Sequence, residues 1–485
     1  MTETADPSVL KRCTAATRSS CRIALRLLLA AAVVAGGTAL VISWRIHSSN
    51  ASENRAIFGA QPLPVAHQRI LIFSPHCDDE TLGAGGYINA AVRAGADVRI
   101  VMMTNGDGFG LAAALHYRKL RITPQLLRSF AYARQREAVR AASALGVKKE
   151  SVEFLGFPDR GLAELWGGHW SPVHPYLSDF TQTDHNPYAN SLHPGAPYCG
   201  ERVLSDVEEE LTRFKPDIVL APHPNDDHPD HWATSSFVRA AIDDLGRQGN
   251  SWANNIRFQV FVVHHGDWPV PQGLHPHERL SPPYSLARTD TSWSEFPLSS
   301  GEEEAKLHAI HRYGSQMAVM SRFLESFVRQ TECFGSIPTA NLNIRHETGS
   351  GLPVVIEYSP VRDTILRTVE QAANIQKLDA LQDGSNVCIR VQVRGAASSK
   401  VIYTLNLRSI GAAGRSNDRW YATVHGAQVN TTIPGGRAWV DGSYLYVSMP
   451  SVDFRPDAEW FVSAETRFPY ATLDRAGWRE LRVQA

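Results

Sequence analysis

Five strand-like apolar runs alternate with helix-like runs between residues 69 and 264, and this alternation restricts the fold more than any other feature. Uninterrupted apolar runs of strand length are typical of strands buried on both faces, and intervening helices are typical of parallel pairing. The expected strands are residues 69–75, 97–105, 152–157, 217–222 and 259–264, and the expected helices are 81–94, 130–145, 204–214 and 229–245. The pattern predicts a Rossmann-like α/β fold with a three-layer, mainly parallel sheet.

After about residue 345 the pattern changes to short β-like runs separated by turn residues. These runs are residues 354–358, 387–393, 401–407, 420–424, 438–440, 444–447 and 460–463. Many short strands with frequent turns are typical of a β-sandwich. We therefore expect an α/β domain over residues 66–345 and a β-rich, sandwich-like accessory domain over residues 346–485.

The N-terminal region contains an uncharged apolar run at residues 27–44, which is near the minimum length for a membrane span. The cations before this run are Lys11, Arg12, Arg18, Arg22 and Arg26. Because cationic flanks stay in the cytoplasm, we expect a cytoplasmic tail (1–26), one transmembrane anchor (27–44) and a linker (45–65). The protein would then be single-pass, with the rest of the chain extracytoplasmic, or periplasmic in a Gram-negative cell. A signal sequence cleaved within Ser48–Ala56 is the open alternative.

The overall charge and the cysteines exclude some classes of function. The formal net charge is −1, which gives no electrostatic footprint for nucleic acid, so we expect no such partner. The six cysteines lack zinc-finger spacing, and Cys199 with Cys333 is a candidate disulfide. An irregular stretch at residues 158–197 is rich in aromatic residues and histidines. It reads either as a wall or lid over a site or as a structural excursion at the edge of the sheet.

Two short clusters carry the chemistry. Pro75-His76-Cys77-Asp78-Asp79-Glu80 and His228-Pro229-Asp230-His231 each follow an expected strand and open an expected helix. Ligands of an open parallel sheet bind beyond the carboxyl ends of its strands, so both clusters are expected to share one pocket. An isolated Asp-Asp pair would ordinarily be read as a helix N-cap. Two complementary clusters at equivalent positions instead indicate a metal site.

The spacing suggests how the residues divide the work. His76 and Asp79 can reach one ion, and His231 can complete the set, which leaves a position for water as in catalytic zinc sites. Zinc lowers the pKa of its water towards about 7. Asp78 is then left to accept a proton from that water. His228, if protonated, can stabilise an oxyanion and give a proton to a leaving amine. Asp230 can orient a histidine from behind.

The first cluster resembles the Ala-His-Pro-Asp-Asp-Glu signature of the LmbE/PIG-L family of zinc-dependent N-deacetylases, and His228–His231 matches the second signature of that family. Weaker echoes are Thr104-Asn105-Gly106-Asp107, Arg134-x-x-Glu137 and Leu155-Gly156-Phe157-Pro158-Asp159. The resemblance covers roughly residues 66–335.

The resemblance implies zinc ligation by His76, Asp79 and His231. It implies that Asp78 is the general base and that His228 is the acid or oxyanion-stabilising group. It also places Arg134 and Asp159 near the sugar, where the alternatives are a helix-surface charge and a turn residue.

The chain departs from the family pattern at two positions. Cys77 stands where the family usually has proline, and packing is its simplest role. Asp226 stands where some relatives have a tyrosine that donates to the oxyanion, so that role is unfilled or moved. His264 is a further candidate for the site, although a lone histidine is more often structural.

We therefore expect a zinc-dependent amidohydrolase with one ion per chain. It would remove the acetyl group from an N-acetylated amino sugar, such as N-acetylglucosamine, or from a glycoconjugate. Ligand types alone do not separate zinc from iron or other divalent metals. Two alternatives stay open: a conjugate amidase that cleaves a larger acyl group, and a surface glycan-binding protein that acts through the β-rich domain.

Overall fold

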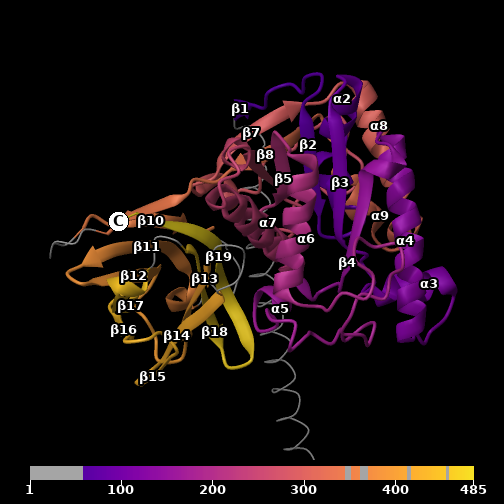
Figure 1. Cartoon of the computed structure of the whole chain (residues 1–485). Coiled ribbons are helices and arrows are strands. Elements are labelled where there is room, and N and C mark those ends of the chain that lie inside the picture. The colour runs from indigo at the N-terminus through magenta and orange to yellow at the C-terminus, as the bar shows by residue number, and fades with distance from the viewer. Residues whose placement is uncertain (1–57, 345–350, 361–369, 412–416, 455–457, 485) are drawn as a thin grey trace, which may run out of the picture.

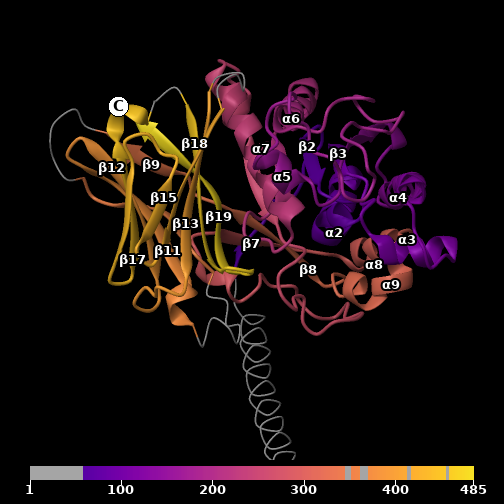
Figure 2. The same ribbon diagram turned by 90° about the horizontal axis from the view of Figure 1, so that it is seen from below.

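The computed structural model describes residues 58–344, 351–360, 370–411, 417–454 and 458–484. An α/β domain and a β-rich region lie side by side (Figures 1 and 2). The strands of the α/β domain are β1 (Gly59–Ala60), β2 (Arg69–Ser74), β3 (Asp97–Thr104), β4 (Val152–Phe157), β5 (Ile218–Pro222), β6 (Arg257–Phe261), β7 (Ser292–Pro297) and β8 (Thr331–Ser336). Its helices are α2 (Asp79–Arg93), α3 (Gly110–Tyr117), α4 (Pro124–Ala144), α5 (Leu162–Trp166), α6 (Gly200–Phe214), α7 (Pro229–Arg247), α8 (Ser300–Ile310) and α9 (Gly314–Glu325).

The eight-stranded sheet is covered by helices on both faces because its central strands are apolar on both faces. Its strand order is β1-β7-β8-β6-β5-β2-β3-β4, and the segment from β6 to β4 is entirely parallel. In β2, Ile70 and Ile72 join the core formed with α2, α4 and α8, whereas Leu71 and Phe73 join the core formed with α6 and α7. The clusters therefore follow strands fixed from both sides.

The other edge of the sheet is mixed. β8 pairs antiparallel with β6 and β7, and β7 pairs parallel with the short β1. These three strands do not follow the strand–helix alternation and are missing from the sequence expectation. The sequence of β7, Ser-Trp-Ser-Glu-Phe-Pro, has polar residues between its two aromatic residues and lacks a continuous apolar run.

The β-rich region consists of two sheets that enclose one core. The five-stranded sheet, in the order β10-β11-β12-β17-β16, contains β10 (Val354–Tyr358), β11 (Ile375–Asp383), β12 (Asn386–Val393), β16 (Arg437–Asp441) and β17 (Tyr444–Pro450). The six-stranded sheet, in the order β15-β14-β13-β18-β19-β9, contains β9 (Ala340–Asn343), β13 (Ile402–Ile410), β14 (Asn417–His425), β15 (Gln428–Thr431), β18 (Glu459–Phe468) and β19 (Ala471–Gln484). β9 enters this sheet before the predicted domain boundary at residue 346, which stays a prediction.

The two parts of the molecule share buried aromatic packing. Trp166, at the end of α5, is fully buried and meets the rings of Phe461 and Trp478 edge-on. The Arg408 side chain of β13 donates to the main-chain oxygens of Trp166 and Gly167. The irregular stretch after β4 thus lies partly between the α/β domain and the β-rich region.

The predicted membrane anchor is the part of the fold prediction that is wrong. None of the helices in the described ranges is both long and apolar enough to cross a membrane. The predicted segment itself, residues 27–44, lies outside the described residues. That prediction rested on hydropathy alone, in a run near the minimum length for a span. We therefore withdraw the predictions of a transmembrane helix, of a membrane partner and of a single-pass location.

The candidate disulfide is not formed. Cys77, Cys199, Cys333 and Cys388, the cysteines in the described part of the chain, are all free and buried. Cys333 donates to the main-chain oxygen of Leu280, on its own side of the fold.

Candidate active site

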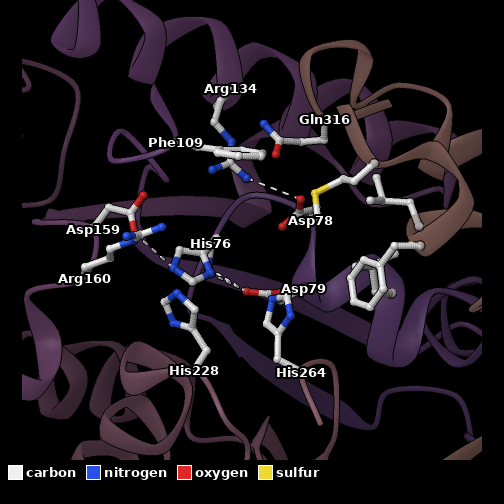
Figure 3. Close-up of a pocket in the computed structure, with 14 residues that line it drawn as sticks. His76, Asp78, Asp79, Phe109, Arg134, Asp159, Arg160, His228, His264 and Gln316 are labelled. Carbon is white, nitrogen blue, oxygen red and sulfur yellow. Dashed lines mark hydrogen bonds and ion pairs between the residues drawn. The ribbon is translucent and has the colours of Figure 1, made fainter. Parts of the chain in front are cut away.

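The two clusters meet because they follow neighbouring parallel strands. β2 ends at Ser74 and leads through the first cluster into α2, and β5 ends at Pro222 and leads through residues 223–228 into α7. β2 pairs with β5 in parallel register, so their carboxyl ends lie at the same edge of the sheet. Figure 3 shows side chains from both clusters facing one cavity.

Three atoms from the two clusters converge closely. His76 Nδ1 lies 3.0 Å from Asp79 Oδ2, and His231 Nε2 lies 3.1 Å from the same oxygen. The two imidazole nitrogens are 3.4 Å apart. Zinc binds nitrogen and oxygen at 2.0–2.2 Å in tetrahedral geometry, which puts its ligand atoms roughly 3.0–3.5 Å from one another. The three atoms therefore fit a single divalent ion.

Carboxylates behind the two imidazoles leave these nitrogens available. His231 Nδ1 lies 3.1 Å from Asp226 Oδ2, so Nδ1 is the protonated nitrogen and Nε2 keeps its lone pair. His76 Nε2 lies 3.2 Å from Asp230 and 3.3 Å from Asp159, which likewise leaves its Nδ1 free. Burial lowers the pKa of His231, but the charges of Asp226 and Asp79 outweigh it and raise that pKa to about 10. An ion that binds Nε2 therefore has to displace a proton from it.

Further ligand sets are possible around His76, and one includes Asp159, His228 and Asp230. Asp230 already accepts main-chain N–H groups, at 2.5 Å from Arg160 and at 3.0 Å from Leu162. Asp159 accepts the Gly108 N–H at 2.7 Å. Since Asp230 and Asp159 both face His76 Nε2, on the far side of the ring from Asp79, we expect these carboxylates to orient His76.

Asp78 lies beside this convergence, against Arg134. The Arg134 guanidinium is 3.3 Å from Asp78 Oδ2 and donates to the main-chain oxygens of Cys77 and Gly106 at 3.2 and 2.9 Å. Burial raises the pKa of Asp78 to about 7, against the opposing charge of Arg134. A Cβ at Gly106 would collide with Arg134, so this approach requires glycine. Both side chains line the cavity (Figure 3).

His228 is the N-cap of α7, and this role fixes its tautomer. Its Nδ1 accepts the Asp230 main-chain N–H at 3.2 Å, so the remaining proton is on Nε2. Its ring packs edge-on against His76, with centroids 4.7 Å apart. Burial and the neighbouring histidines His76 and His231 lower the pKa of His228 to about 2. His228 is therefore a neutral imidazole with one N–H available to the cavity.

A model of the GlcNAc-PI de-N-acetylase (PIG-L) family matches residues 71–242, a range that contains both clusters. Residues 71–242 are a PIG-L family domain. The chain is 32% identical, over 179 residues, to the 1D-myo-inositol 2-acetamido-2-deoxy-alpha-D-glucopyranoside deacetylases of Mycobacterium sp. strains KMS and JLS. Each match covers 36% of this chain and 50% of the relative, so the chain spans about half the length of these curated relatives.

A solved structure similar to this chain is N,N'-diacetylchitobiose deacetylase from Pyrococcus horikoshii. It is 18% identical, and the match covers 55% of this chain and 82% of that chain, with a TM-score of 0.34. A likeness at this level is not informative about activity.

The cavity extends beyond the matched PIG-L range. It measures about 160 Å³, and its far wall is apolar and comes largely from α9. The lining residues from this part of the chain are His264, Gln316, Met320, Phe323 and Leu324. His264 stacks on Phe323 with ring centroids 5.4 Å apart and lies 4.9 Å from the His231 ring. His264 is thus part of the cavity wall.

Sequence reasoning missed the part that Asp226 plays in the geometry. Asp226 is fully buried and accepts the main-chain N–H groups of His228, Val263 and His264, besides facing His231. Its position two residues before the second cluster was noted only as a departure from the family. The available signal in the sequence was an acidic residue shortly after the apolar run of a predicted strand.

Proposed function

We propose that this chain is a metal-dependent amide hydrolase that removes the acetyl group from an N-acetylated amino sugar or glycoconjugate. The convergence of His76 Nδ1, Asp79 Oδ2 and His231 Nε2 carries this proposal. A divalent ion held by these three residues supplies a Lewis acid that polarises a carbonyl group and lowers the pKa of water. We take zinc as the expected ion, since two imidazoles and a carboxylate suit it.

The remaining residues of the site would move the protons and stabilise charge. Asp78 accepts the proton of the attacking water and then delivers it to the leaving nitrogen. Arg134 holds the Asp78 carboxylate in place. The neutral His228 donates its Nε2–H to the oxyanion that develops on the carbonyl oxygen. Since a neutral imidazole is a poor proton donor to an amine, we assign that proton to Asp78 and not to His228.

The size of the cavity supports a small acyl group. Sites for drug-sized ligands measure roughly 300–1,000 Å³, whereas this cavity is about 160 Å³. An acetyl group suits it better than the larger acyl group of a conjugate amidase. The names of the curated relatives, deacetylases of an N-acetylated sugar glycoside, agree with this choice of substrate class. Contact of Arg134 or Asp159 with the sugar is part of the same proposal.

The test uses the purified full-length chain loaded with zinc. It is incubated with N-acetylglucosamine, its inositol glycoside and N-acetylated chito-oligosaccharides, and acetate and free amine are measured together. We expect equal amounts of the two products from at least one substrate. Release of a bulkier acid from acylated sugars, without acetate from any N-acetyl sugar, would favour the conjugate amidase.

The matched control is Asp78→Asn, which keeps the shape of the side chain but is a far weaker base. We expect zinc content to match the wild type by elemental analysis and the rate to fall by about 10²–10⁴. Undiminished turnover in this variant would refute the base assignment. Tight glycan binding by the full chain with no hydrolysis would favour a binding protein.

A further inference from the structure

The loop that opens the second cluster is held from outside its own domain. Asn225 is buried, and both ends of its side-chain amide are bound by the β-rich region. Its Nδ2 donates to Glu357 of β10 at 2.6 Å, and its Oδ1 accepts from Arg479 of β19 at 3.2 Å. Glu357 and Arg479 belong to different sheets, are both buried, and lie 3.6 Å apart as an ion pair. Both sheets of the β-rich region therefore form hydrogen bonds with the side chain of Asn225.

A second contact reaches the next residue of the loop. Arg475 of β19 donates to the main-chain oxygen of Asp226 at 3.0 Å, and its guanidinium lies over the Trp232 ring. Between the two arginines, Gly477 lets the strand approach closely: a Cβ there would lie 2.8 Å from the Pro224 oxygen. The register of β19 against β18 shifts at this point.

From Asp226 the contacts lead directly to a proposed metal ligand. The main chain of Asp226 is fixed by Arg475, and its side chain is 3.1 Å from His231 Nδ1. That carboxylate sets which His231 nitrogen faces Asp79. Residues behind metal-ligating histidines typically change metal affinity about 10–100-fold when they are altered. A shift of residues 223–228 would therefore displace His231 Nε2, the proposed ligand atom.

We propose that the β-rich region completes the metal site, with Arg475 and Arg479 as positioning residues that hold Asn225 and Asp226 and, through them, His231. This inference rests on the proposed role of His231 as a metal ligand. The β-rich region then acts as a structural part of the active site.

The opposite end of α7 offers a matched control. Arg247 also bridges the two parts of the molecule, with contacts to Glu459 of β18 and to the Ile410 main-chain oxygen of β13. α7 has 19 residues, so Arg247 is roughly 27 Å along the helix from the second cluster. Arg247→Met weakens the same interface without touching the loop.

The experiment measures cobalt(II) binding and its visible absorption spectrum in the full-length chain. The variants are Arg479→Met, Arg479→Lys, Asn225→Ala and Arg247→Met, each followed by thermal unfolding. We expect a cobalt Kd raised about 10–100-fold and an altered spectrum in Arg479→Met and Asn225→Ala. We expect partial rescue in Arg479→Lys. Arg247→Met should lose thermal stability while keeping the wild-type Kd and spectrum.

A wild-type Kd and spectrum in folded Arg479→Met and Asn225→Ala would overturn the inference. Equal effects of Arg247→Met and Arg479→Met on cobalt binding would overturn it as well, because the interface would then act only through overall stability. If Arg479→Met does not fold, Asn225→Ala and Arg475→Met decide by the same criteria. Failure of the wild-type chain to bind cobalt would instead refute the proposed function itself.

Discussion

The two clusters of the site are held in different ways. The first is fixed from within the α/β domain: Thr104 donates to the Pro75 main-chain oxygen at 2.8 Å, and Ser74 Oγ donates to Glu80 at 2.9 Å. The second depends on Asn225 and Asp226, which also contact the β-rich region. Two motifs can therefore be equally clear in the sequence although one is held by its own domain and the other also by residues of a different part of the molecule.

Removing one proposed ligand from each cluster has the largest expected effect. The two clusters should then behave alike, because both contribute ligands to the same metal ion. We expect His76→Ala and His231→Ala each to lose zinc and activity. Elemental analysis of the purified variants measures the zinc. Full occupancy in both variants would overturn the ligand set.

Altering the support of the first cluster should affect rate more than metal. Arg134→Met leaves Asp78 without its partner, and a misplaced catalytic group can cost about 10²-fold in rate. We expect kcat to fall by about that factor while zinc content stays at the wild-type level. Loss of zinc in parallel with activity would show that Arg134 supports the whole centre.

Altering the support of the second cluster should affect metal more than rate. Asp226→Asn removes the charge that faces His231 Nδ1, and we expect zinc affinity to fall about 10–100-fold. At saturating zinc, kcat should recover most of its wild-type value. A competition titration with a chromophoric chelator measures the affinity, and an unchanged Kd would contradict the orienting role.

A pH effect on stability is expected from Asp107, which is buried beside Asp159. Burial and the charge of Asp159 raise the pKa of Asp107 from 3.8 to about 7. Since the folded state binds this proton more tightly, its contribution to stability is complete below pH 3.8. It is then lost as the pH rises through 7.

Asp107→Asn should therefore flatten the change in unfolding free energy between pH 4 and about 7. Urea unfolding of both proteins across this range measures the difference. Identical pH profiles for the variant and the wild type would contradict the raised pKa.

The smallest effect is expected at Cys77, which departs from the first signature. Its side chain is fully buried in the core, and burial raises the pKa of its thiol. Cys77→Ala should keep its zinc and change kcat/KM less than about twofold, with only a packing cost to stability. Loss of zinc in this variant would instead indicate coordination by the thiol.

The sequence was most informative where structure repeats locally. Continuous apolar runs indicated β2 to β6, whereas β7 and β8, near the mixed edge of the sheet, were missed because their sequences lack such a run. In the β-rich region β19 was missed as well. Its sequence is rich in charge because Arg475, Arg479 and Glu480 contact the α/β domain through hydrogen bonds and ion pairs.

The site followed the same rule. Neighbouring parallel strands bring His76, Asp79 and His231 together, as their spacing suggested. The orienting role of Asp226 depends on the path of residues 223–228, which no local pattern specifies. The membrane anchor was an error of the opposite kind, a feature predicted but not found in the described part of the chain, because the prediction used hydropathy alone.

The second cluster and the arginines of β19 that hold its loop lie far apart along the chain, and this has a consequence for protein synthesis. Arg479 is translated 254 residues after Asn225. During translation the α/β strands can pair while the ribosome is still producing β10 to β19. On the proposed role of these arginines, a nascent chain would have both motifs in place yet bind its ion weakly until the last strand emerges and docks.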